Sequence, residues 1–90
     1  MKMTQDEFLQ AYAKYKNTVY SVIFNYVKNN EDANDLQQEV FIRLLKSDAD
    51  FDSDEHMKAW LIRVAANLSK NLLRDNSRIS DAPLSEEIAY

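Results

Sequence analysis

The chain has 90 residues and a formal net charge of −4, with 46% hydrophobic residues, no cysteine, no glycine and one proline. A chain of this length makes one small domain, and its apolar content is enough to bury a core. The absence of cysteine excludes disulfides and thiolate metal sites, and the absence of glycine excludes glycine-rich phosphate loops. We therefore expect an all-α fold, a small bundle of three to four helices.

The charge is distributed unevenly along the chain. Residues 31–55 hold nine acidic and two basic side chains, whereas residues 56–80 hold five basic and one acidic. A chain with adjacent acidic and basic segments can bind two partners of opposite charge. No apolar run approaches the ~18 residues of a membrane span, and the N-terminus lacks the apolar stretch of a signal peptide. We therefore expect a cytoplasmic protein that does not insert into a membrane.

The first predicted helix covers residues 4–28. Thr4 and Glu7 have the spacing of a capping box, in which the two side chains bind the free N–H groups of the first turn. Apolar and aromatic residues then recur at helical spacing, which predicts a buried stripe. This stripe consists of Phe8, Tyr12, Tyr15, Val19, Val22, Ile23 and Tyr26. The pair Asn29-Asn30 predicts the end of this helix.

The second predicted helix covers residues 31–46. Its expected buried face consists of Ala33, Leu36, Val40 and Leu44, widened by Phe41 and Leu45. The opposite face carries Asp35, Gln38, Glu39 and Ile42. An isoleucine among carboxylates and an amide indicates a binding face, although most acidic side chains on a helix surface are only solvated. Periodicity leaves both interpretations open.

A polar connector separates the second helix from the third. Aspartates alternate with other residues in it, as in a calcium-binding loop, but such a loop needs a glycine at its turn and a bidentate glutamate at its end. The connector has no glycine and Glu55 comes too early, so we expect no metal site here. Phe51 is its one aromatic residue.

The third predicted helix begins with a cap at Asp52 or Asp54 and ends near Arg74 or Asp75. Its expected core stripe is Met57, Leu61, Val64, Ala65, Leu68 and Leu72. A second row consists of Arg63, Asn67, Lys70 and Arg74, flanked by Asn71, with Trp60 on the border between this row and the core. Such a row is either a solvated outer face or a ridge that follows nucleic-acid phosphates, with an amide able to contact base edges. No acidic residue lies between positions 56 and 74, which favours the second interpretation.

Two stretches of the chain resemble a known family. The segment from Asp35 to Leu45, Asp-Leu-Gln-Gln-Glu-Val-Phe-Ile-Arg-Leu-Leu, is similar to the polymerase-binding segment of bacterial RNA polymerase sigma factors. The segment from Lys58 to Leu68, Lys-Ala-Trp-Leu-Ile-Arg-Val-Ala-Ala-Asn-Leu, resembles the promoter-melting and −10-recognising helix of the same domain, region two. The short connector and the order of the elements are similar to the extracytoplasmic-function (ECF) group. The resemblance covers roughly residues 4–78, and the two motifs together are specific.

The resemblance implies a role for each of these segments. In that family the first segment binds a coiled coil of the largest polymerase subunit, which assigns Asp35, Gln38 and Glu39 to polymerase contact, with Ile42 and Arg43 as neighbours. The next helix and the loop before it hold the non-template strand of the promoter −10 element, with one base flipped out and captured. The residues expected near DNA are Phe51, Trp60, Arg63, Asn67, Lys70, Asn71 and Arg74. Of these, Asn67 is the best candidate for a base contact, and Trp60 is expected to lie mostly in the core.

The resemblance also sets expectations for the rest of the chain. Full-length members carry a second, helix-turn-helix domain, so we expect residues 1–78 to form the helical domain and residues 79–90 to be a linker or tail toward a domain that is absent here. An anti-sigma factor is an expected partner. The acidic connector is unusual near DNA because carboxylates repel phosphates, so we expect weak DNA binding by this domain alone. The implied function is transcription initiation without enzymatic activity or a cofactor, and the alternative is a helical adaptor that binds only proteins.

Overall fold

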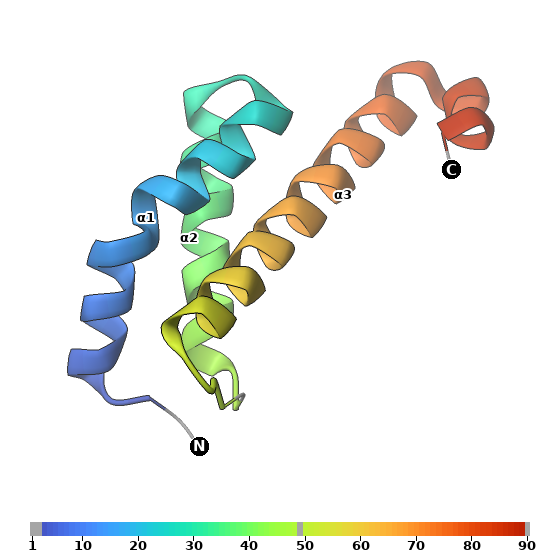
Figure 1. Ribbon diagram of the computed structural model, residues 1–90. Coiled ribbons are helices and arrows are strands. Elements are labelled where there is room, and N and C mark those ends of the chain that lie inside the picture. Colours follow the sequence, from blue (N-terminus) through green and yellow to red (C-terminus); the bar gives the residue numbers. More distant parts are fainter. Residues whose placement is uncertain (1–2, 49, 90) are drawn as a thin grey trace.

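Three helices make up the fold: α1 (Gln5–Val27), α2 (Asn30–Lys46) and α3 (Asp54–Ala89). The computed structural model describes the backbone of residues 3–48 and 50–89, and the side chains of these ranges as far as residue 75. Figure 1 shows α1 and α2 side by side, with the longer α3 packed against both. These ranges contain no strand, so the predicted all-α bundle is confirmed. None of the helices in them is both long enough and apolar enough for a membrane span.

The ends of α1 and α2 follow from local side-chain chemistry. Thr4 and Glu7 form the predicted capping box, since the Glu7 N–H donates to Thr4 Oγ1 at 3.1 Å and the Thr4 N–H donates to Glu7 Oε1 at 2.9 Å. Lys28 ends α1 with φ 63° and ψ 21°, a left-handed conformation that helix ends usually give to glycine. Asn29 then caps α2 by accepting the Asp32 N–H at 2.8 Å. Two residues are therefore enough to separate the helices.

The core lies where the three helices meet. Its buried apolar residues are Ala11, Tyr15, Val19, Ile23 and Val27 of α1, Ala33, Val40, Phe41 and Leu44 of α2, and Leu61 and Ala65 of α3. Further members of the predicted stripes pack half-buried against this core: Phe8, Val22, Tyr26, Leu36, Met57, Val64, Leu68 and Leu72. The helical spacing of apolar residues therefore correctly predicted which side of each helix faces the core.

Ser69 of α3 is fully buried although it is polar. Its hydroxyl donates to the Ala65 carbonyl one turn earlier, at 2.8 Å, so the buried donor has a partner. Ala65 and Ser69 are both small, and small side chains at a contact allow two helices to approach closely. A pattern of apolar residues excludes serine, so the sequence carries no signal that this position is buried.

The third helix is longer than the sequence predicted. The expected end near Arg74 or Asp75 is wrong, because the backbone stays helical to Ala89. The added stretch contains no glycine and includes good helix formers such as Leu84. In Figure 1 the last turns, drawn red, bend away from the helix axis. Pro83 lies in this stretch and has no N–H for a helical hydrogen bond, which accounts for a bend.

Candidate functional site

The outer side of α2 carries the residues that the sequence assigned to polymerase contact. Asp35, Gln38 and Arg43 are exposed, and Ile42 is 44% exposed. Glu39 is half-buried and pairs with Arg43, whose Nε lies 3.1 Å from Glu39 Oε2. This pair spans one helical turn and holds both side chains along the helix. We call Asp35, Gln38, Glu39 and Ile42 the α2 face; Arg43 lies at its edge.

An apolar groove lies beside the α2 face, between α1 and α2. It has a volume of about 340 Å³ and is lined by Phe8, Leu9 and Tyr12 of α1 and by Gln38, Phe41, Ile42 and Leu45 of α2. The ring of Phe41 is buried, and the rings of Phe8 and Tyr12 meet it edge-on with centroids 6.3 and 4.9 Å away. Leu9 and Leu45 are 52% and 49% exposed. The groove therefore extends the α2 face with unburied apolar surface.

The groove corrects two predictions of core residues. Tyr12 and Leu45 were expected to be buried, but they are 37% and 49% exposed. The cause is the side of the helices on which these residues lie. On α1, Tyr12 meets Phe41 of α2, whereas Lys14, about 200° further around the helix, meets Asp54 of α3. The groove therefore lies on the side of the α1–α2 pair that α3 does not cover, and no signal in the sequence shows which side that is.

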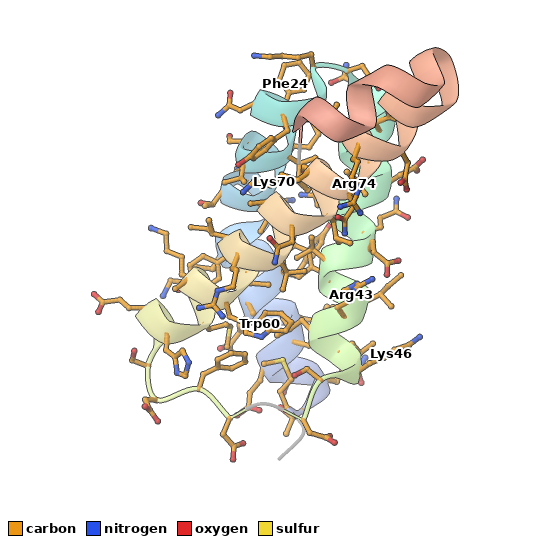
Figure 2. The ribbon with its side chains drawn as sticks, turned by 90° about the vertical axis from the view of Figure 1, so that its right-hand side faces the viewer. Phe24, Arg43, Lys46, Trp60, Lys70 and Arg74 are labelled. Atoms are coloured by element: carbon orange, nitrogen blue, oxygen red, sulfur yellow. The ribbon has the colours of Figure 1, made fainter. Side chains whose placement is uncertain are left out.

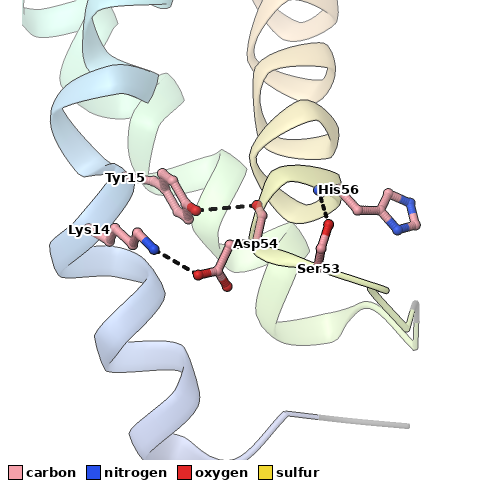
Figure 3. Close-up of polar contacts among 5 residues, drawn as sticks. All are labelled: Lys14, Tyr15, Ser53, Asp54 and His56. Carbon is pink, nitrogen blue, oxygen red and sulfur yellow. Dashed lines mark hydrogen bonds and ion pairs between the residues drawn. The ribbon is translucent and has the colours of Figure 1, made fainter.

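The start of α3 is joined to α1 through Asp54 (Figure 3). Lys14 Nζ lies 2.7 Å from Asp54 Oδ2, and the Tyr15 hydroxyl donates to the Asp54 main-chain carbonyl at 3.2 Å. The hydrogen bond to the Asp54 carboxylate, and then its charge, raise the pKa of Lys14. One residue of α3 is thus held through both its side chain and its backbone.

Ser53 caps α3, whereas the sequence predicted Asp52 or Asp54 in this role. The Ser53 hydroxyl accepts the His56 N–H at 3.1 Å, as Figure 3 shows. Asp54 is instead the first residue of the helix, and its carboxylate points toward Lys14. The Asp52 N–H donates to His56 Nδ1 at 3.2 Å. The connector is therefore tied to the first turn of α3 by two hydrogen bonds that meet at His56.

Phe51 and Trp60 form an aromatic corner at the start of α3. Their ring centroids are 5.7 Å apart at an interplanar angle of 68°, and Phe51 also meets His56 edge-on at 5.3 Å. Both residues are half-buried against the core. Edge-on packing fixes the orientation of each ring. The part of each ring that stays open is a surface on which a nucleic-acid base can stack.

The predicted row of basic and amide side chains runs along α3. Arg63, Asn67, Lys70 and Asn71 are exposed, and Arg74 is half-buried. Arg74 Nη2 donates to Asn71 Oδ1 at 3.1 Å, which orders one end of the row. Figure 2 shows Trp60, Lys70 and Arg74 along the length of α3 in a single view. We call these five basic and amide residues the α3 ridge, and the aromatic corner lies at its N-terminal end.

The chemistry of both surfaces is that of binding. The α2 face and the groove suit a helix of another protein, because apolar side chains supply burial and carboxylates orient arginine partners. The α3 ridge and the aromatic corner suit a single strand of nucleic acid, because cations bind phosphates, amides bind base edges and rings stack on bases. Both surfaces thus carry groups suited to binding, and they lie on adjacent helices.

Comparison with known families agrees with this description. A family model described as sigma-70 region 2 matches residues 11–79. The chain belongs to this family, and several curated relatives are ECF RNA polymerase sigma factors. The resemblance inferred from the two sequence motifs is therefore confirmed.

Three relatives illustrate the extent of the match. The ECF RNA polymerase sigma factor SigW of Bacillus subtilis (strain 168) is 33% identical over 73 residues, which cover 81% of this chain and 39% of the relative. The RNA polymerase sigma-H factor of Pseudomonas aeruginosa is 31% identical over 77 residues, which cover 84% and 40%. The ECF RNA polymerase sigma-E factor of Escherichia coli (strain K12) is 33% identical over 72 residues, which cover 80% and 37%. The chain thus spans about two fifths of the length of these relatives. No solved structure matches it significantly.

Proposed function

We propose that this chain is the part of an ECF sigma factor that couples core RNA polymerase to promoter DNA and helps to open the −10 element. In this proposal the α2 face binds the coiled coil of the largest polymerase subunit. The α3 ridge and the aromatic corner hold the non-template strand. The relatives are named RNA polymerase sigma factors, which supports polymerase as the partner. The activity is binding without bond-making chemistry, and we expect it in the cytoplasm.

The α2 face suits a partner helix that carries arginine. Asp35 and Glu39 are four residues apart, so their carboxylates lie one turn apart on the same side of the helix. Ile42 lies between the groove and these carboxylates and adds apolar area to the contact. Bidentate bonds between arginine and carboxylates fix the register of a bound helix. Because Arg43 already holds Glu39, that carboxylate is oriented before the partner arrives.

The α3 ridge suits the phosphates and bases of a single strand. Arg63 and Lys70 can neutralise phosphates, and Asn67 between them can form hydrogen bonds with a base edge. Phe51 and Trp60 offer rings on which an unstacked base can lie. Such capture offsets part of the unstacking cost of roughly a few kcal/mol, and polymerase contacts supply the remainder. Strand opening by this route needs no nucleophile and no cofactor.

The main support for the proposal is that the α2 face and the α3 ridge lie on two helices that pack against each other. The helices α2 and α3 pack against each other and against α1. A polymerase bound to the α2 face therefore holds the α3 ridge at a fixed position and raises its effective concentration near the promoter. This arrangement explains how a chain with a net charge of −4 can act on DNA.

A pull-down with bacterial core RNA polymerase tests the polymerase contact. We expect capture of the wild-type chain and loss of capture for Asp35→Arg and Glu39→Lys, with helix content by circular dichroism unchanged. Glu55→Lys is the matched control, because it reverses an exposed charge on α3 instead of α2. Retained capture of Glu39→Lys would remove the α2 face from the interface. No capture of a folded wild-type chain would favour the alternative, an adaptor that binds other proteins and does not contact nucleic acid.

Asn67→Ala tests the base contact. The variant should be captured by polymerase like the wild type and should lose discrimination at one position of the −10 strand. The measurement is the affinity of the polymerase complex for a set of oligonucleotides that differ by single bases. An equal loss of affinity on every sequence would make Asn67 a contact of the DNA backbone only.

The proposal extends to the rest of the protein and to its control. Residues 1–78 act as the domain described above, and residues 79–90 lead toward a helix-turn-helix domain that reads the −35 element. An anti-sigma factor that competes with polymerase is the expected regulator. Addition of such a protein to the pull-down should displace the chain from core polymerase.

A further inference from the structure

Arg43 lies on the side of α2 that is turned away from α1. Phe41 meets the rings of Phe8 and Tyr12 on α1, and Arg43, two residues later, is about 200° further around the helix. Arg43 therefore borders the side of α2 that packs toward α3. Figure 2 views the molecule from the α3 side, and Arg43 and Lys46 of α2 are labelled toward the right-hand edge of that view.

The last turn of α2 carries two cations, Arg43 and Lys46, and both are exposed. The helix dipole favours cations at this end, so the dipole alone would explain a positive charge there. Their position gives a second reason, because the connector that follows α2 leads directly to Phe51 of the aromatic corner. Glu39 engages Arg43 through Nε, and the terminal Nη groups of an arginine can bind a phosphate at the same time.

We propose that Arg43 and Lys46 bind phosphates of the same DNA strand that lies on the α3 ridge. The DNA-binding surface then continues across the aromatic corner onto the last turn of α2. This inference rests on the proposed function and deepens it, because Arg43 serves the DNA contact while its partner Glu39 serves the polymerase contact. The Glu39–Arg43 ion pair thus joins the two interfaces through one helical turn.

The test measures DNA binding by the chain in complex with core RNA polymerase. The probe is a short fluorescent single-stranded DNA of mixed sequence, because phosphate contacts do not depend on sequence. Arg43→Gln and Lys46→Gln each remove one charge, and glutamine at position 43 can still bond to Glu39. Each variant should bind the probe about fivefold more weakly near 0.1 M salt, and the slope of log affinity against log salt should fall in magnitude by about 0.7.

Lys58→Gln is the matched control. Lys58 is exposed on α3 but lies about 140° around the helix from Arg63, away from the α3 ridge. Its loss should leave both the affinity and the salt slope unchanged. The same panel is assayed for capture by core polymerase, where Lys46→Gln and Lys58→Gln should equal the wild type. Arg43→Gln loses the ion pair with Glu39, so its DNA affinity is measured at a polymerase concentration that saturates the chain.

The outcomes separate this inference from the function on which it rests. Wild-type affinity and salt slope in both Arg43→Gln and Lys46→Gln would overturn the inference and leave the proposed function standing. Weaker polymerase capture in Arg43→Gln, with wild-type DNA affinity at saturating polymerase, would assign Arg43 to the polymerase contact and overturn its role in DNA binding. A wild-type complex that binds the probe no better than polymerase alone would overturn the proposed function itself.

Discussion

Lys14 of α1 and Asp54 of α3 form an ion pair of 2.7 Å that joins two helices forty positions apart in the sequence. The neighbouring Tyr15 donates its hydroxyl to the main-chain carbonyl of the same aspartate at 3.2 Å. These contacts fix both the position and the direction of the first turn of α3. Trp60 of the aromatic corner and the α3 ridge follow along this helix, so the contact sets where these proposed DNA-binding side chains lie relative to α2.

The ion pair makes stability depend on pH in the alkaline range. Asp54 raises the pKa of Lys14 above its ordinary value of 10.5, by its hydrogen bond and then by its charge. A group with a higher pKa in the folded state stabilises the fold while it is protonated, so this contribution is fully present below 10.5 and is lost as the pH rises through the raised pKa. We expect urea to unfold Lys14→Gln at a slightly lower concentration than the wild type at neutral pH, with no difference at strongly alkaline pH. The effect is small because the pair is exposed.

Asp54→Asn supplies the control for this titration. In that background Lys14→Gln should have no effect at any pH, because the charge partner is gone. A difference between Lys14→Gln and the wild type that persists at strongly alkaline pH would instead assign the effect to packing of the lysine over the Tyr15 ring, whose centroid lies 5.4 Å from Nζ.

Tyr15→Phe tests the second bond to Asp54. Tyr15 is 7% exposed, so the variant keeps the buried ring and removes only the hydroxyl donor. We expect the free energy of unfolding, measured in urea, to fall by about 1 kcal/mol. Unchanged stability would mean that water replaces the hydroxyl at the Asp54 carbonyl without cost.

The sequence predicted which side of each helix faces the core, because burial in a helix repeats every 3.6 residues. It did not predict which side of the α1–α2 pair the third helix covers, and this is why Tyr12 and Leu45 line a groove although they lie on apolar stripes. The residues of the α2 face were found because they are contiguous in a motif. Leu9 was not found, because it reaches the same surface from α1 and has no local signature. Such a site depends on tertiary placement that a local pattern does not encode.

Substitutions of Ser69 test how closely α3 packs against the rest of the bundle. Ser69→Ala removes a hydroxyl bonded within its own helix and keeps the volume small, so we expect a loss of less than about 1 kcal/mol in unfolding free energy. Ser69→Leu inserts a large side chain at a fully buried position and should cost about 1–3 kcal/mol. Urea denaturation of the two variants measures the difference. Equal stability of both would show that the contact around Ser69 has room for a larger side chain.

We expect that replacing Lys28 by glycine stabilises the domain. Its φ of 63° places a lysine in the left-handed region, which costs a non-glycine residue about 1–2 kcal/mol. Lys28→Gly should raise the free energy of unfolding by about 0.5–1 kcal/mol, because the relief of strain exceeds the added entropy of the unfolded chain. Lys28→Ala is the control: it keeps the strain and should be no more stable than the wild type. A stabilised alanine variant would assign the effect to the lysine side chain instead of the backbone.

Leu45→Ser tests whether the apolar groove belongs to the polymerase interface. Leu45 is 49% exposed, and burial of a whole leucine is worth about 1.5–3 kcal/mol, so covering its exposed half should contribute about 1 kcal/mol to binding. Its loss should weaken the affinity for core polymerase about fivefold. Leu73→Ser is the matched control, because Leu73 is a 37% exposed leucine on α3, away from the groove. Affinities are compared for variants whose helix content equals that of the wild type. A selective loss in Leu45→Ser would support a polymerase interface that includes the groove, whereas equal affinity of both variants would restrict it to the carboxylates and Ile42 of the α2 face.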